Sequence, residues 1–134
     1  MILAPARARD RGSITAFVVV ITMTIMACAG LAVDGARVVG AKVAAADHAE
    51  NAARAGAQEV TALREGGPPR LDPARARASA EAYLADQGVS GEVSATAQRI
   101  TVTVRATVAT TLLRLVGISA KTVTATRSSE PVEQ

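Results

Sequence analysis

The stretch that decides the fold runs from Gly12 to Val33 and reads GSITAFVVVITMTIMACAGLAV. Its 22 residues carry no charge, and Arg11 and Asp34 close it on either side. About 20 apolar residues are enough for an α-helix to cross a hydrocarbon core of ~30 Å. The serine and threonines can bond the backbone of their own helix, so a bilayer tolerates them. The sequence therefore predicts a transmembrane helix over residues 12–33.

The charges on either side of this segment predict its orientation. Residues 1–11 carry a net charge of about +3 with the amino terminus included, whereas residues 34–50 carry about −1. Because positively charged flanks stay in the cytoplasm, residues 1–11 are expected to form a basic cytoplasmic tail. The remainder of the chain is expected to lie outside. The sequence thus predicts a single-pass protein whose first partner is the lipid bilayer.

Two other interpretations of the same stretch remain open. A secretory signal peptide would use Ile14–Met26 as its apolar region and Ala27-Cys28-Ala29 as a cleavage site. A lipoprotein would instead be acylated at Cys28. Either would leave a secreted or lipid-anchored binding module without residues 1 to about 29. The apolar run continues through Leu31-Ala32-Val33, where a mature N-terminus usually turns polar, and this favours a retained anchor.

Helix-forming residues continue beyond the membrane segment. Residues 34–65 contain no proline and are rich in alanine, so a stalk helix is expected there, continuous from Ser13 to Arg64. Small residues recur at every fourth position and form a candidate helix-packing track: Ala32, Ala36, Gly40 and Ala44. Asp34 is expected to make a contact at the membrane interface, either as a polar stop at the headgroups or by pairing with a basic group of an assembly partner.

A change of pattern follows the stalk. Residues 66–71 form a Gly/Pro linker, and Asp72-Pro73 supplies an N-cap and a first-turn proline for a helix from Ala74 to Gln87. Alternating residues then predict three strands, with a short helix or apolar loop between the second and third: 93–97, 100–108 and 121–127. Residues 72–127 are therefore expected to form a small α+β domain, and residues 128–134 a polar tail.

The predicted fold class is thus α+β, with a long N-terminal transmembrane and stalk helix, a small helix and a three-stranded antiparallel sheet. A domain of this size with almost no aromatic residues supports only a small core of its own. We therefore expect it to gain stability from the stalk helix or from neighbouring copies.

Composition excludes several classes of function. Alanine occupies 30 positions and valine 16, whereas aromatic residues make up 1% and there is one His and one Cys. No disulfide framework, zinc finger or nucleophile–base–acid set can be assembled from this inventory within one chain. The net charge is +3, but basic residues are interleaved with acids and lack aromatic stacking partners. The sequence predicts no enzyme, no cofactor or metal, no small-molecule substrate and no nucleic-acid partner.

The order of these parts resembles the TadE/TadG-like minor pilins (pseudopilins) of bacterial tight-adherence, or Flp, pilus systems. The resemblance rests on Arg11-Gly12-Ser13 before an apolar helix, then on residues 30–37, GLAVDGAR, and on residues 44–57, AAADHAENAARAGA. The strand–loop–strand ending over residues 106–125 is similar as well. Together the similar parts cover roughly residues 11–127.

The resemblance implies a role in the assembly of a pilus at the bacterial inner membrane, with other pilins and the assembly platform as partners. It also implies a pilin-like fold and self-association among pilin helices. Prepilin peptidases cut such proteins after a glycine, which here places the candidate processing site between Gly12 and Ser13. The family's acid at the fifth mature position is replaced by Phe17, which is closer to the TadG-like branch and favours a retained anchor. An accessory subunit of a membrane enzyme or transporter is a third, less favoured class.

Overall fold

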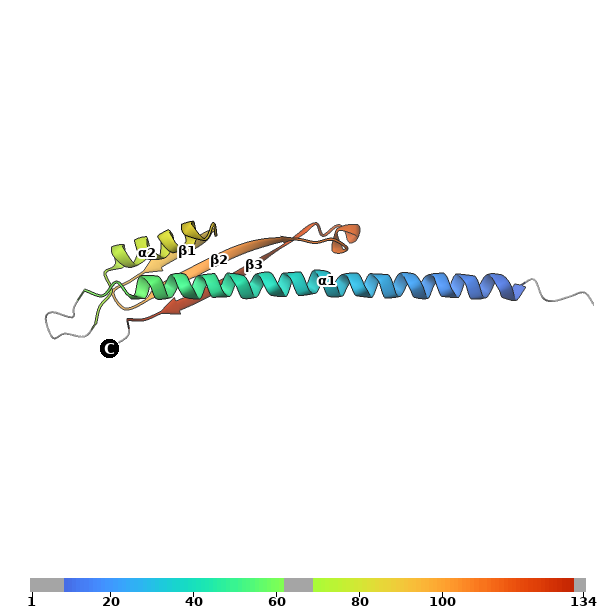
Figure 1. The fold of residues 1–134 in the computed structure, drawn as a ribbon, viewed down its shortest axis with the longest axis horizontal. Helices are drawn as coiled ribbons and strands as arrows, with labels where there is room; N and C mark the ends of the chain where they lie inside the picture. The colour runs from blue at the N-terminus through green and yellow to red at the C-terminus, as the bar shows by residue number, and fades with distance from the viewer. Residues whose placement is uncertain (1–8, 62–68, 132–134) are drawn as a thin grey trace, which may run out of the picture.

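The computed structural model describes residues 9–61 and 69–131 of the chain, arranged as one long helix with a small sheet and a second helix packed near one end (Figure 1). The elements follow in the order α1 (Arg9–Ala57), α2 (Pro73–Asp86), β1 (Gly91–Ala95), β2 (Ile100–Ala109), the 3₁₀-helix η1 (Leu113–Val116) and β3 (Ala120–Ser129). The expected α+β fold class, with a long N-terminal helix and a three-stranded antiparallel sheet, is confirmed.

The long helix α1 is uninterrupted over 49 residues. Its N-terminal half stands clear of the rest of the chain, and its large apolar side chains are exposed there (Figure 1). From Gly12 onward α1 is long and apolar enough to cross a membrane. The predicted transmembrane and stalk segments are therefore parts of a single continuous helix.

The helix α1 ends at Ala57, earlier than the Arg64 expected from the sequence. Val60 instead forms an antiparallel bridge with Leu71, and the Thr61 backbone N–H donates to the Arg70 carbonyl at 2.9 Å. These bonds tie the end of α1 to the chain that leads into α2. The β-branched side chains of Val60 and Thr61 suit the extended backbone that such a bridge needs. Residues 66–68 of the predicted Gly/Pro linker lie outside the described residues.

The second helix, α2, begins and ends as its sequence predicts. The Asp72 carboxylate accepts hydrogen bonds from the backbone N–H groups of Ala74 at 3.0 Å and Arg75 at 3.1 Å, while Pro73 occupies the first turn. These bonds satisfy amides that the helix itself leaves without partners. At the other end, Gly88 adopts a φ of 65°, the left-handed conformation that glycine accepts readily.

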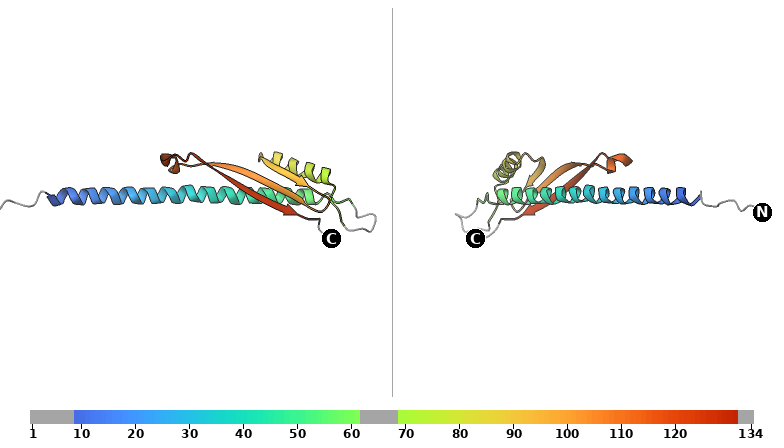
Figure 2. Two further views of the ribbon diagram at one scale, coloured as in Figure 1. Left: turned by 180° about the vertical axis from the view of Figure 1, so that it is seen from behind. Right: turned by 45° about the vertical axis from the view of Figure 1, so that its right-hand side comes forward.

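The sheet has the order β1-β2-β3, with both pairs antiparallel. Its strands lie obliquely across the C-terminal half of α1 (Figures 1 and 2). β3 continues to Ser129, two residues into the segment predicted as a polar tail, because Ser128 and Ser129 pair with Thr101 and Ile100 of β2. The Ser128 and Thr101 hydroxyls also lie 3.0 Å apart and share a hydrogen bond.

Both helices cover the same face of the sheet. A side chain added at Gly56 of α1 would lie 2.2 Å from the Ile100 side chain and 2.6 Å from the Ala76 carbonyl oxygen of α2. The core between these layers is built from alanines of the helices and larger side chains of the strands: Ala45, Ala49, Ala52, Ala53, Ala76, Ala80, Leu84, Ile100, Val102 and Val104. The stalk half of α1 is thus one layer of the domain, as the small size of the predicted domain led us to expect.

Candidate functional site: a clasp between the long helix and the hairpin tip

The β2–β3 hairpin extends along α1 toward the N-terminus and ends beside the middle of the helix (Figure 1). We call residues 110–119 the hairpin tip. The Thr110 N–H donates to the Ser119 carbonyl at 3.1 Å and closes the tip at its base. Inside it, the Ile118 N–H donates to the Leu113 carbonyl at 2.9 Å, and Gly117 adopts a φ of 89°. The tip is therefore a closed, internally bonded loop.

Asp34 of α1 binds the backbone of this tip. Its carboxylate accepts hydrogen bonds from three consecutive N–H groups: Thr111 at 2.9 Å to Oδ1, Leu112 at 2.7 Å to Oδ2 and Leu113 at 3.0 Å to Oδ2. The residue is only 1% exposed. Successive backbone amides that converge on one point form a favourable site for an anion, here supplied by the same chain. We refer to this contact as the clasp.

Arg37, one turn further along α1, completes the clasp. Its guanidinium Nη1 lies 3.8 Å from Asp34 Oδ1 and donates a hydrogen bond of 2.6 Å to the Thr111 hydroxyl. The Arg37 side chain is 53% exposed, so water screens its attraction to the carboxylate. Arg37 therefore contributes mainly by orienting the loop, whereas the three amides hold the charge.

These contacts lower the pKa of the Asp34 carboxyl below its usual range. The largest cause is the hydrogen bond from the Leu113 N–H, followed by that from Thr111, with smaller contributions from Leu112 and from the charge of Arg37. Burial acts in the opposite direction, because it penalises the charged form. The amides outweigh this penalty, so Asp34 is a carboxylate at neutral pH.

A close packing contact adjoins the clasp. A Cβ placed on Gly30 would lie 1.3 Å from Leu112 Cδ1 and 2.6 Å from Leu112 Cγ. The absence of a side chain at Gly30 therefore gives Leu112 its place against α1. Gly30 and Asp34 are four residues apart and so lie on the same face of the helix.

Sequence reasoning singled out Asp34 but not its partners. The clasp joins residues separated by 77 to 79 positions, and alternation or helix periodicity cannot predict such a contact. Two features of the sequence could have indicated this contact: the four-residue spacing of Gly30 and Asp34, and the apolar Leu112-Leu113 pair in a loop. Contact of Asp34 with headgroups or with an assembly partner stays a prediction.

The candidate helix-packing residues lie on a different face of α1. Ala32, Ala36, Gly40 and Ala44 are all exposed, whereas the residues that face the sheet side are Gly30, Asp34, Ala45 and Ala49. Val39 and Val43, beside this track and beyond residue 33, are 63% and 55% exposed. Gly12 and Ser13, the candidate processing site, lie in the first turns of α1. Packing and processing at these residues stay predictions.

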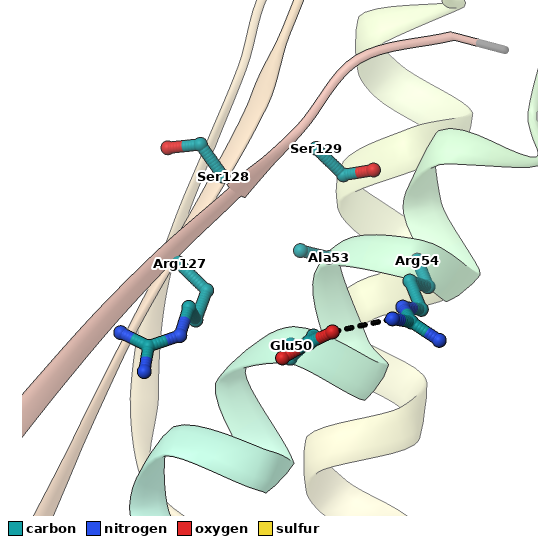
Figure 3. A pocket seen from close by; sticks show the side chains of 6 residues that line it. All are labelled: Glu50, Ala53, Arg54, Arg127, Ser128 and Ser129. Atoms are coloured by element: carbon teal, nitrogen blue, oxygen red, sulfur yellow. Dashed lines mark hydrogen bonds and ion pairs between the residues drawn. The ribbon is translucent and has the colours of Figure 1, made fainter.

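A second feature is a shallow polar hollow of about 330 Å³ between α1 and the end of β3 (Figure 3). Figure 3 shows Glu50 paired with Arg54 on α1, while Arg127 and Ser129 lie on the α1 side of β3 and the Ser128 side chain points away. The hollow brings together one carboxylate and two guanidinium groups but no nucleophile with a base. Across residues 9–61 and 69–131, no group of three His, Cys, Asp or Glu side chains is placed to hold a metal ion.

Comparison with known protein families gives a match, which lies in the N-terminal part of the chain. Residues 12–59 match the model of a family described as putative Flp pilus-assembly TadE/G-like proteins. This match covers the apolar segment, the helix side of the clasp and the alanine-rich face that packs on the sheet. No curated protein and no solved structure matches the chain. Over residues 12–59, the chain is thus similar to the TadE/G-like proteins of the Flp pilus-assembly system.

Proposed function

We propose that the protein is a non-enzymatic minor pilin, or pseudopilin, held in the bacterial inner membrane by α1. Its residues 1–11 lie in the cytoplasm and its sheet domain outside. The observation that carries this proposal is the division of α1 into an apolar half with exposed side chains and an alanine-rich half packed into the domain. An apolar helix segment that the rest of its own chain leaves uncovered suits lipid, and the continuity of α1 supports a domain that lies directly at the membrane surface.

The exposed face of α1 supports assembly through helix packing. Ala36, Gly40 and Ala44 allow a second helix to approach closely, and the exposed Val39 and Val43 offer apolar area to it beyond the membrane segment. In a single copy of the chain, Val39 and Val43 lie beyond the proposed membrane segment and are not covered by the rest of the protein. Another pilin-like helix, from a second copy or a pilin partner, would cover them.

The sheet offers a second surface for partners. β3 is an edge strand of ten residues, and unpaired edges tend to pair with other chains. Lys121 and Arg127 on this strand oppose the pairing of two identical edges by charge. We therefore assign this edge to contacts with a different pilus component.

Intact mass of the protein extracted from its native membrane tests the anchor. The full-chain mass is expected, because Phe17 stands where processed pilins carry an acid. Loss of residues 1–12 would replace the retained anchor by a processed fibre subunit. Loss through Ala27 or Ala29 would contradict the membrane assignment and leave a secreted or lipid-anchored module.

Protease treatment of intact spheroplasts tests the orientation. The sheet domain is expected to be cleaved from outside, with a tag on residues 1–11 protected until the membrane is permeabilised.

Deletion of the gene in the producing bacterium should reduce Flp pilus assembly, and the intact chain should restore it. Normal piliation in the deletion strain would contradict the assembly role.

A further inference from the structure

The hairpin tip lies level with the end of the apolar segment of α1. Leu112 packs at Gly30, and the tip amides bind Asp34, the first residue after that segment. At 1.5 Å per residue, Gly30 lies about 4.5 Å closer to the membrane centre than Val33 does along the helix. If residues 12–33 fill the hydrocarbon core, the tip is therefore at the membrane surface.

The tip carries apolar side chains that nothing in the chain covers. Leu115 is 81% exposed and Ile118 is 46% exposed. Outside α1, these are the exposed large hydrophobic side chains among those that the structure describes, and both lie in the tip. The domain buries its other described large apolar side chains at least in part, so the exposure is concentrated at the level of the membrane.

The charge around the tip is positive. The sequence contains no Asp or Glu from Val93 to Ser129, whereas Arg114 and Lys121 are exposed in and beside the tip. Asp34, the acid of the clasp, is buried and bonded to the loop amides. Exposed leucine and isoleucine beside basic residues are the chemistry of peptides that bind the interface of an anionic bilayer.

The clasp gives this loop a fixed place relative to α1. Asp34 and Arg37 bind it from the helix, and Thr110 closes its base. The loop therefore cannot leave the level of the bilayer surface without breaking these bonds. A second point of membrane contact, to one side of α1, would also fix the rotation of that helix and direct its Ala36–Ala44 face away from the tip.

We propose that the hairpin tip is a second membrane contact, located at the headgroup–acyl boundary of the leaflet from which α1 emerges. Leu115 and Ile118 enter the acyl region, and Arg114 and Lys121 bind lipid phosphates. This inference rests on the proposed anchoring of α1. The position of the tip along α1, its exposed apolar side chains and its positive charge all favour lipid over a second protein as the partner of the tip.

Tryptophan fluorescence tests the proposal, because the chain contains no tryptophan. Full-length Leu115→Trp is reconstituted in vesicles of phosphatidylcholine and phosphatidylglycerol, with and without bromine on the acyl chains. Phe17→Trp, inside the apolar segment, is the positive control. Gln98→Trp, on the exposed turn between β1 and β2 at the opposite end of the sheet, is the negative control. Ile118→Trp is a second probe of the tip.

We expect blue-shifted emission and bromine quenching for Leu115→Trp and Ile118→Trp, strong quenching for Phe17→Trp and none for Gln98→Trp. We also expect Leu115→Trp to be quenched more in vesicles that contain phosphatidylglycerol than in vesicles of phosphatidylcholine alone. Adding Arg114→Gln and Lys121→Gln to Leu115→Trp should reduce this difference. Quenching of Phe17→Trp without quenching at either tip probe would overturn the tip proposal alone. A blue shift at the tip without bromine quenching would assign it to a protein contact, which also overturns the proposal. Unquenched Phe17→Trp would overturn the membrane anchor itself.

Discussion

The buried Asp34 carboxylate accepts hydrogen bonds from three backbone N–H groups. The stability of this contact therefore depends more on the charge of the side chain than on its shape. In Asp34→Asn the side chain keeps one acceptor oxygen, but the other oxygen is replaced by an NH₂ group. That group is a hydrogen-bond donor and faces the backbone N–H groups of the tip, which are donors as well. We expect the free energy of unfolding to fall by about 1–3 kcal/mol, the cost of leaving buried polar groups without partners. Urea unfolding in detergent micelles measures the loss. Asp47→Asn, at an exposed position of the same helix, is the control and should change little.

The lowered pKa of Asp34 makes the clasp sensitive to acid. A carboxyl group with a folded-state pKa below its unfolded value stabilises the fold fully above the unfolded pKa. That contribution declines as pH falls below the unfolded value toward the lowered folded pKa. We expect hydrogen exchange at the amides of Thr111, Leu112 and Leu113 to accelerate, after correction for intrinsic rates, when the pH falls below about 4. In Asp34→Asn this pH dependence should vanish, and its persistence would contradict the assignment.

Two glycines of α1 are expected to respond in opposite ways to the same substitution. Gly30→Ala places a Cβ against Leu112, and we expect a loss of about 1–3 kcal/mol from overpacking. Gly35→Ala meets no atom within 4 Å, so it should stabilise α1 by up to about 1 kcal/mol through helix propensity. Adding Leu112→Ala should recover part of the Gly30→Ala loss. Equal effects at the two glycines would show that Leu112 does not pack there.

At the scale of elements, α1 has a face buried against the domain and an exposed face, and we expect substitutions on the two faces to have different effects. Ala49 is fully buried against the domain, whereas Ala44 is exposed on the small-residue track. Ala49→Leu is expected to lower the free energy of unfolding by about 1–3 kcal/mol through overpacking. Ala44→Leu should leave it unchanged but reduce pilus assembly, because a larger side chain separates packed helices. Circular dichroism and counts of surface pili measure the two effects, and normal piliation with Ala44→Leu would argue against packing through this track.

At the scale of the whole molecule, we expect the apolar half of α1, the proposed anchor, to contribute little to the stability of the fold. Its side chains are exposed, and the clasp and the core begin at Gly30 and continue toward the C-terminus. A chain of residues 30–134 is therefore expected to fold with a cooperative urea transition close to that of the full chain. Circular dichroism at matched detergent concentration measures it. An unfolded fragment would show that residues 9–29 stabilise the domain directly.

The sequence alone determined the local structure of most of the chain. The apolar run and the alanine-rich segment after it predicted α1, Asp72-Pro73 predicted the start of α2, and alternation predicted the strands. Each of these signals acts between residues that are close in the chain, where helix and strand periodicity leave a readable pattern. The end of α1 was misplaced because the Val60–Leu71 bridge pairs two segments across the linker.

Only the tertiary structure decided how these elements are joined. The folding of the hairpin back along α1 depends on Asp34, Gly30 and the tip amides, which lie more than 70 residues apart in the chain. A carboxylate after an apolar run reads as a polar stop, because the backbone amides that bind it have no sequence signature. Geometry alone shows that this acid is buried and that the exposed Leu115 lies in the loop whose amides it binds.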